Sequence, residues 1–292
     1  MPDTSHTDRW TPYVTDIRAR ERERPLSATL IAAEFHTPTL KDFFPELLFG
    51  GTTDDPAWWA MDRLMLIRVV VAVLVAAAFY FAMRRPKIVP GGAQNVAENA
   101  LDWVRINIAE EILGKENGRK FLTIIATIFF VTIFLNLTSI IPFLNISSNA
   151  RIGMPMVMAG VAYVTYCWVG IAKYGFFGFI KSSIVLPGVP LPIHFLLVPI
   201  EFVSTFILRP FTLTVRLMAN MLSGHIMLAL FFAATQYFII DQSGLWTFAG
   251  IGGILAAVGF TFFELLVIGL QAYIFALLTA VYIDQSIHAD SH

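Results

Sequence analysis

Two long apolar stretches near the C-terminus constrain this chain more than any other feature. Residues 191–238 stay mostly apolar for about 48 positions, and residues 246–283 do so for another 38. A 38-residue helix is about 57 Å long, nearly twice the thickness of a hydrocarbon core of about 30 Å. Such helices must be strongly tilted or broken. Pro192, Pro199 and Pro210 predict breaks in the first stretch, so we expect a surface or re-entrant piece before a long helix that begins near Pro210.

The second stretch is rich in small residues at 249–259, where the sequence reads AGIGGILAAVG. Small side chains allow two helix backbones to approach closely within a membrane. We therefore expect the two stretches to form a pair of long, tilted and closely packed helices.

The composition is that of a membrane protein. Hydrophobic residues make up 57% and charged residues 14% of the 292-residue chain, whereas an average soluble domain is about 25% charged. Of the 41 charged residues, 18 lie in positions 1–63, 13 in 64–120 and 10 in the remaining 172. We therefore divide the chain into a polar N-terminal segment, 1–63, and a membrane domain, 64–292. The net charge of −1 and the lack of a phosphate-binding loop indicate that the chain binds no nucleic acid.

The polar segment contains no apolar run of the secretory type. Residues 1–30 mix charges of both signs, so we expect a solvated segment, partly disordered or lying on a surface, rather than a cleaved signal. For Leu40–Gly50, which has two Phe and two Leu beside acids, two alternatives remain open: a short amphipathic helix on the membrane surface, and a plain loop.

Three further spans are expected at about 64–83, 121–144 and 154–172. Between the first two, apolar residues recur every four positions, which predicts a helix lying in the membrane interface at about 91–113. The predicted fold class is therefore an all-α polytopic membrane protein with about five transmembrane helices, the last two long, plus interfacial helices.

The Lys and Arg residues of the loops predict the orientation. Segment 84–120 carries seven of them, loop 145–153 carries one and loop 173–190 carries two. Since positive residues concentrate on the cytoplasmic side, segment 84–120 is expected to face the cytoplasm. The N-terminus then lies outside and the C-terminus in the cytoplasm.

Arg216 is the most costly residue of the membrane domain. Its neighbours within three positions are apolar or threonine, and placing a guanidinium at such depth costs about 2.5–3.5 kcal/mol. On a helical wheel Asn220 and Ser223 lie about 40° and 20° from Arg216, which predicts one polar stripe, whereas His225 lies about 180° round. The alternatives are an arginine paired within its own bundle or with a headgroup, and a hydrogen-bonded core histidine.

Glu264 and Gln271 lie inside apolar sequence of the second long helix. Because they are seven residues apart, they share one face. Ionisable groups at this depth usually mark ion or proton paths; the alternative is a buried neutral acid.

These residues fall in a recognisable pattern. The runs PIEFVSTFILRPFTLTVRLMANMLSGHIMLALFF and FELLVIGLQAYIFALLTAVYI closely resemble the C-terminal half of subunit a of F-type ATP synthases. The resemblance extends to VPGGAQNVAENALDWV and FLNLTSIIPF, so it covers about 64–288, and its specific part, 199–283, falls in a stator core of about 191–283. The polar head with EFHTPTLKDFFPELLFGGT resembles actinobacterial versions.

The resemblance implies a role for each polar residue. Arg216 matches the family's stator arginine, which faces a rotating ring of c subunits. Asn220 and Gln271 match polar positions that accompany this arginine. His225 and Glu264 fall where family members place one histidine and one acid.

Two more residues complete the expected proton path. Glu201 resembles another channel acid, although it lies one residue farther from Pro210 than in some relatives. Ser223 joins the path through the polar stripe of Arg216.

The resemblance also implies partners and a location. These are the c-subunit ring, b-type peripheral stalk subunits, other ATP synthase subunits and the lipid bilayer, in the plasma membrane of a bacterium. The chain is then a non-catalytic ion-channel component, with no cofactor and no metal. Because it has no nucleotide-binding loop, ATP chemistry belongs to other subunits.

Elementary electrostatics supports this assignment of Arg216. A rotor carboxylate must be neutral in lipid, so it needs a water-accessible half-channel on each side of the membrane to exchange its proton. Arg216 between the half-channels would stabilise the carboxylate as an anion and would repel protons, so that they do not pass directly from one half-channel to the other. An arginine stays charged there, whereas a desolvated lysine can become neutral.

Two other classes of membrane protein remain as alternatives. A secondary transporter with a buried Arg–Glu gate would be expected to contain a structural repeat, and the sequence shows none. A haem- or quinone-binding respiratory subunit would need paired histidines facing one cavity, and only His194 and His225 are candidates, on segments without such spacing.

Overall fold

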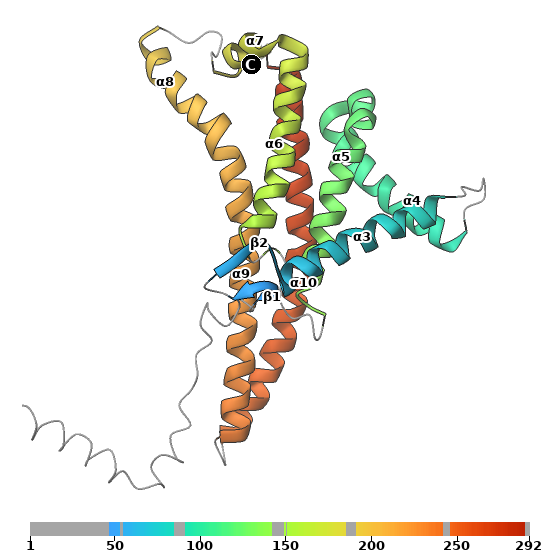
Figure 1. Ribbon diagram of the computed structural model, residues 1–292, viewed down its shortest axis with the longest axis vertical. Helices are drawn as coiled ribbons and strands as arrows, with labels where there is room; N and C mark the ends of the chain where they lie inside the picture. Colours follow the sequence, from blue (N-terminus) through green and yellow to red (C-terminus); the bar gives the residue numbers. More distant parts are fainter. Residues whose placement is uncertain are drawn as a thin grey trace, which may run out of the picture. The chain divides into compact units, whose positions relative to one another are not determined.

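The computed structural model describes residues 47–52, 55–84, 91–141, 149, 151–184, 191–241 and 246–289 (Figure 1). In these ranges five helical segments are long and apolar enough to cross a membrane. They cover Arg63–Met83, Gly92–Leu137, Gly153–Tyr174, Phe195–Ile239 and Phe248–Ile287. The predicted all-α membrane fold with about five transmembrane helices is therefore confirmed.

A β-hairpin precedes the first membrane helix. Strand β1, Leu47–Thr52, pairs antiparallel with strand β2, Asp55–Asp62. The prediction of a helix or a loop at Leu40–Gly50 is therefore wrong for residues 47–50, and the rest of that segment lies outside the described residues. Phe and Thr in β1 and two Trp in β2 favour extended structure, and the charges beside them do not prevent pairing.

The first three membrane segments are built from α3 to α6. Helix α3 spans Arg63–Met83, α4 spans Gly92–Val104, the π-helix η2 spans Arg105–Glu110, α5 spans Glu111–Leu137 and α6 spans Gly153–Tyr174. The expected interfacial helix at 91–113 corresponds to α4, η2 and the first residues of α5.

Helix α5 ends earlier than the expected span, 121–144, because the chain turns after Leu137. The hydroxyl groups of Thr138 and Ser139 donate to the backbone oxygens of Leu135 and Asn136, both at 2.7 Å. These bonds satisfy carbonyl groups that would otherwise be unpaired at the helix end.

A glycine separates the interfacial part of α5 from its membrane part. Gly114 has φ 73°, a left-handed conformation that reverses the chain direction and that residues with a side chain rarely adopt. Beyond it, Gly118 packs so closely that a Cβ atom there would lie 2.8 Å from the backbone oxygen of Ala109. The two glycines therefore fold the membrane part of α5 back onto η2.

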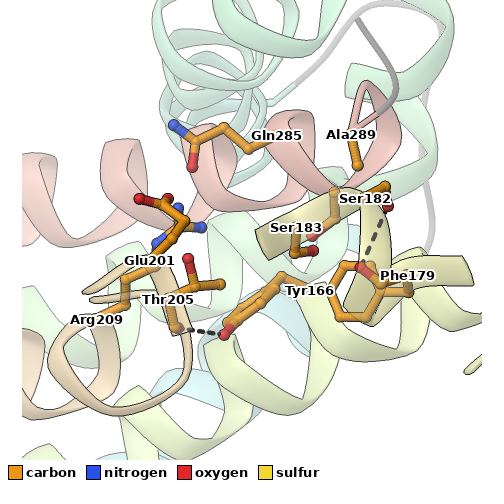
Figure 2. A pocket seen from close by; sticks show the side chains of 10 residues that line it. Tyr166, Phe179, Ser182, Ser183, Glu201, Thr205, Arg209, Gln285 and Ala289 are labelled. Carbon is orange, nitrogen blue, oxygen red and sulfur yellow. Dashed lines mark hydrogen bonds between the residues drawn. The ribbon is translucent and has the colours of Figure 1, made fainter. Parts of the chain in front are cut away.

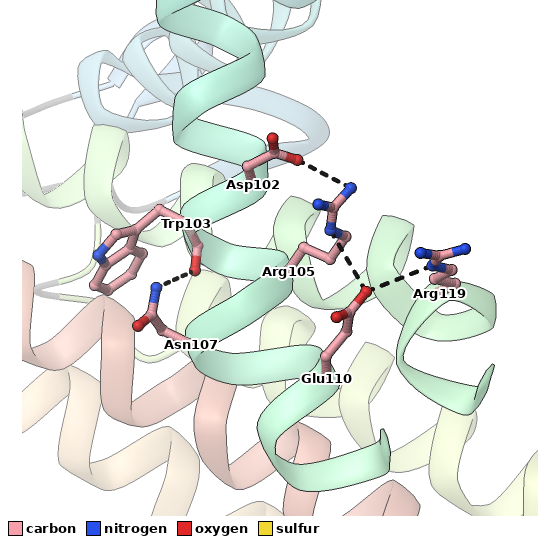
Figure 3. A network of polar contacts seen from close by, with 6 residues as sticks. All are labelled: Asp102, Trp103, Arg105, Asn107, Glu110 and Arg119. Carbon is pink, nitrogen blue, oxygen red and sulfur yellow. Dashed lines mark hydrogen bonds and ion pairs between the residues drawn. The ribbon is translucent and has the colours of Figure 1, made fainter. Parts of the chain in front are cut away.

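Charged side chains join η2 to the membrane part of α5 (Figure 3). Arg105 contacts Asp102 at 3.1 Å and Glu110 at 3.5 Å, and Arg119 also contacts Glu110 at 3.5 Å. The expected placement of these charges in the membrane interface explains how so many can cluster beside apolar spans.

The C-terminal region consists of α7 to α10. Helix α7 spans Phe176–Ile184, α8 spans Leu191–Val203, the π-helix η4 spans Ser204–Leu208, α9 spans Arg209–Gln236, the π-helix η5 spans Tyr237–Asp241 and α10 spans Trp246–Ile287. The end of α10 is held against α6, because Lys173 and Tyr174 both donate to the backbone oxygen of Ile287.

The predicted break between α8 and α9 is wrong, since the chain is helical from Leu191 to Asp241. Pro210 has no N–H to donate to the carbonyl of Phe206. The π-helical turn η4 lies just before it, and the chain stays helical across the proline. The hydroxyl of Tyr166 donates to the backbone oxygen of Thr205 at 2.8 Å inside this turn. A side chain from α6 thus satisfies a carbonyl of the irregular turn.

By its contacts the chain separates into two compact units, one containing residues 229–257 and the other residues 39–228 and 258–292. In the first unit the end of α9 packs on the start of α10. A Cβ atom on Gly250 would lie 2.4 Å from the side chain of Ile239, and one on Gly253 would lie 2.5 Å from that of Thr235. Small residues therefore do allow close approach of the two long helices, as the sequence predicts.

In the second unit α4, η2, α5, α6 and the C-terminal part of α10 share one apolar core. Figure 1 shows α6 and α10 side by side. Val104, Ile108, Ile125, Tyr166 and Ala276 are buried in this core. It holds α10 in place where α10 carries its polar residues.

Candidate functional site

Helix α9 has one polar exposed face. Arg216 and Ser223 are exposed and Asn220 is half-buried, so the predicted stripe lies on the side of the helix that this chain leaves open. The guanidinium of Arg216 makes no ion pair or hydrogen bond with any residue that the structure describes. This charge therefore lacks an anionic partner within the described parts of its own chain.

The opposite face of α9 is buried. His225 is 4% exposed and lies in one row with Leu217 and Met221. Arg216 and His225 thus lie in different environments, as their half-turn separation on the helix predicts.

Helix α10 turns the side chains of Glu264 and Gln271 inward. Glu264 is 3% exposed and Gln271 is 5% exposed, whereas Phe262, Phe263 and Leu266 are all exposed. The acid and the amide share one buried face, two helical turns apart.

Glu264 lies where α9 and α10 come close together. A Cβ atom on Gly224 would lie 3.1 Å from Oε1 of Glu264. Gly224 precedes His225 directly, so the structure brings the acid to the level of the histidine. Close approach at a glycine is what allows an ionisable side chain to fit between two membrane helices.

Three buried polar residues that sequence reasoning missed lie at the end of α5 or in contact with it. Ser139 lies beside the carboxyl group of Glu264, but its hydroxyl donates to the backbone of Asn136. Asn149 donates to Oδ1 of Asn136 at 2.6 Å, and both amides are fully buried. Asn136 and Ser139 belong to the motif FLNLTSIIPF, so a polar pair inside an apolar run was the available signal.

Several polar atoms in this region have no hydrogen-bond partner among the described residues. They are both carboxyl oxygens of Glu264, Nδ2 of Asn136 and Nε2 of Gln271. Buried polar groups are costly unless they are hydrogen-bonded, so these atoms call for water or for a proton carried by the acid.

Glu201 lies in a separate place. It lines a pocket of about 220 Å³ together with Tyr166, Ser182, Thr205, Arg209 and Gln285 (Figure 2). Thr205 Oγ1 and Gln285 Oε1 are buried without a partner among the described residues. The pocket is large enough and polar enough to hold several waters. The structure therefore places Glu264 at the level of His225 and leaves Glu201 at a second polar cavity.

Comparison with known proteins agrees with the sequence motifs. The protein-family model described as ATP synthase A chain matches residues 65–284. A relative named ATP synthase subunit a from Rhodococcus erythropolis is 64% identical over 276 residues, which are 94% of this chain and 98% of the relative. Another of that name, from Streptomyces lividans, is 36% identical over 258 residues, which are 88% of this chain and 89% of the relative. The matched segment covers all or most of each of the five membrane helices described above, and the chain belongs to the ATP synthase A chain family.

Proposed function

We propose that this chain is the proton-translocating stator subunit of a rotary ATP synthase, with Arg216 facing the carboxylates of a c-subunit ring. The observation that carries the proposal is the exposed, unpaired guanidinium of Arg216 on an apolar helix. A charge at that depth is stable only with an anionic partner or water. Since the described residues supply no anion, the partner that we propose is a carboxylate of another chain.

The outer half-channel is proposed to run through His225 and Glu264. The close approach at Gly224 and the unpaired carboxyl oxygens of Glu264 support this route. Asn136 and Ser139 extend it with polar atoms next to the acid. Such groups can pass protons along a chain of waters because each can donate and accept.

Gln271 is proposed to continue this path toward Arg216. Helices α9 and α10 run antiparallel, because Gly250 lies near Ile239 while Gly253 lies near Thr235. Glu264 lies at the level of Gly224. Because the two helices are antiparallel, a residue seven positions later on α10 lies near the level of position 217 on α9. Gln271 therefore lies at about the height of Arg216. On α9 itself, Asn220 and Ser223 extend the polar face from Arg216 toward the outer side.

The inner half-channel is proposed to begin at the pocket that contains Glu201. Arg209, which lines this pocket, lies two turns before Arg216 on the same face of α9. The pocket thus approaches the stator charge from the side opposite to His225. In the proposed orientation the pocket faces the cytoplasm and the N-terminus lies outside, in the plasma membrane of a bacterium.

The proposed assembly includes other chains. The exposed face of α9 would meet the c ring, and b-type peripheral stalk subunits would hold this chain against rotation. A transporter with an internal Arg–Glu gate is disfavoured, because Arg216 is exposed while Glu264 is buried away from it.

Cysteine cross-linking tests this assignment of faces. In a Cys167→Ser background, Ser223→Cys is expected to cross-link to a cysteine on a c-subunit helix, whereas His225→Cys is expected to react with small aqueous thiol reagents added from the outer side. The two positions differ by two residues on one helix, so each is the control for the other. Equal cross-linking of both to the ring would contradict the two-face arrangement.

A further inference from the structure

A fully buried threonine of α5, Thr132, has a hydroxyl group that its own helix does not use. Its Oγ1 has no hydrogen-bond partner among the described residues. Five other helical threonines donate their hydroxyl to the backbone oxygen four residues earlier: Thr127, Thr165, Thr212, Thr214 and Thr279. A helical threonine can also take a rotamer that does not make this bond, and Thr132 does so.

Helices α5 and α10 lie antiparallel in the second compact unit. Ser139, just beyond the end of α5, lies beside the carboxyl group of Glu264. The ring centre of Trp103 lies 5.6 Å from that of Phe129 on α5 and 6.0 Å from that of Tyr273 on α10. Between these two points the residue number falls by ten along α5 and rises by nine along α10. Since each helical residue rises about 1.5 Å, the two contacts fix the register of the helices to within about one residue.

This register places Thr132 at the level of Gln271. Thr132 precedes Ser139 by seven residues, and Gln271 follows Glu264 by seven, which is two helical turns in each case. Because residues seven apart share a helix face, Thr132 and Gln271 face one another as Ser139 and Glu264 do.

The packing around this pair agrees with the register. One turn farther along each helix, Ile128 of α5 and Phe275 of α10 are buried in one apolar cluster with Leu217 of α9. Leu217 follows Arg216 directly. The pair therefore lies at about the height of Arg216, where an apolar core begins.

The unpaired atoms of the two side chains are complementary. Nε2 of Gln271 is a hydrogen-bond donor without a partner among the described residues, and the hydroxyl of Thr132 can accept as well as donate. We propose that Thr132 is a positioning residue of the outer half-channel: its hydroxyl accepts a hydrogen bond from the Gln271 amide, directly or through one water, and so holds Gln271 at the level of Arg216. Because Gln271 belongs to the proton path only under the proposed function, this role of Thr132 rests on that function.

Packing alone does not account for a threonine at this position. Valine has nearly the same shape and no polar atom, so it would fill the site without leaving a hydroxyl unpaired. A buried hydroxyl that bonds neither to its own backbone nor to another described residue fits a role in holding a second polar group. Thr132→Val is therefore expected to assemble normally.

Structures of the assembled complex test the hydrogen bond. Cryo-electron microscopy at a resolution that shows ordered water is expected to place Oγ1 of Thr132 within hydrogen-bond distance of the Gln271 amide, or of one water that bonds to both. In Thr132→Val the side chain of Gln271 is expected to leave this position. The proposal is overturned if the hydroxyl bonds instead to the backbone oxygen of Ile128, or if Gln271 stays in place in Thr132→Val.

Proton pumping tests the role of the bond. ATP-driven acidification of inverted vesicles, normalised to the amount of assembled complex, is expected to be several-fold slower in Thr132→Val and mostly retained in Thr132→Ser, which keeps the hydroxyl. Thr279→Val is the matched control, because Thr279 is also fully buried but its hydroxyl already bonds to the backbone oxygen of Phe275. Equal slowing in the two valine variants, or equal slowing in Thr132→Ser and Thr132→Val, would overturn the proposal.

Arg216→Ala separates this role from the proposed function. If Arg216→Ala retains proton-driven ATP synthesis, the proposed function itself fails. If Arg216→Ala abolishes synthesis while Thr132→Val pumps at the rate of the unmodified complex, the stator role stands and the positioning role of Thr132 fails.

Discussion

Gly224 shows how a single residue controls the candidate site. It is the point on α9 that Glu264 approaches, and a Cβ atom there would leave 3.1 Å to the carboxyl oxygen. That distance is tighter than most real Cβ contacts, so a Cβ atom alone would shift the acid by a few tenths of an ångström and a larger side chain would shift it further. Residue 224 therefore sets the position of the acid relative to His225.

Gly224→Val is expected to reduce ATP-driven proton pumping several-fold, because the added side chain moves Glu264 out of its route. The measurement is acidification of inverted vesicles, normalised to the amount of assembled complex. Gly160→Val is the matched control, since a Cβ atom at Gly160 meets nothing within 4 Å. Equal loss in both variants would mean that Gly224 acts only through general stability.

Exchange of His225 and Glu264 tests whether the two residues share one path. A proton relay depends on proximity and on matched acidity rather than on which helix carries which group. His225→Glu with Glu264→His is therefore expected to pump faster than His225→Glu alone, a non-additive result typical of neighbours. Pumping in inverted vesicles across a pH series checks this, and strictly additive losses would assign the residues to separate places.

The sequence predicted part of this site because helix periodicity is local. Spacings of four, seven and nine residues place Arg216, His225, Glu264 and Gln271 on their faces without knowledge of any tertiary contact. The approach of Ser139 to Glu264 joins residues far apart in the chain. No local pattern contains that information.

At the scale of elements, the π-helical turn η4 explains the main error of the sequence analysis. Proline usually interrupts a helix, so three prolines in one stretch predicted a break. The free-energy cost of the N–H group that proline lacks is local, and η4 together with the hydrogen bond from Tyr166 to Thr205 offsets it.

Tyr166→Phe is expected to destabilise the complex by about 1–3 kcal/mol, because it leaves the buried carbonyl of Thr205 without its partner. The measurement is the thermal unfolding midpoint of the purified complex. Tyr80→Phe, at an exposed position of α3, is the control and should leave the midpoint unchanged. An equal shift in both variants would show that the bond in η4 contributes nothing specific.

At the scale of the whole molecule, apolar residues cover much of the described surface. Phe81, Trp168, Phe177 and Phe195 are all more than 60% exposed. Such exposure fits a protein whose solvent is lipid, and it follows from the composition alone. The number of membrane segments was predictable for the same reason. The partner that we propose for Arg216 was not predictable from residue patterns, because the proposal places it on another chain; only the resemblance to known stator subunits named it.

ATP synthesis driven by a proton gradient in membranes that carry Arg216 variants tests the central claim most directly. Arg216→Ala and Arg216→Lys are both expected to abolish synthesis while the complex still assembles, since the guanidinium serves another chain and not the core of its own. Arg119→Ala is the control, because Arg119 pairs with Glu110 of the same chain, and it should retain synthesis. Normal proton-driven synthesis with Arg216→Ala would contradict the stator role of this arginine.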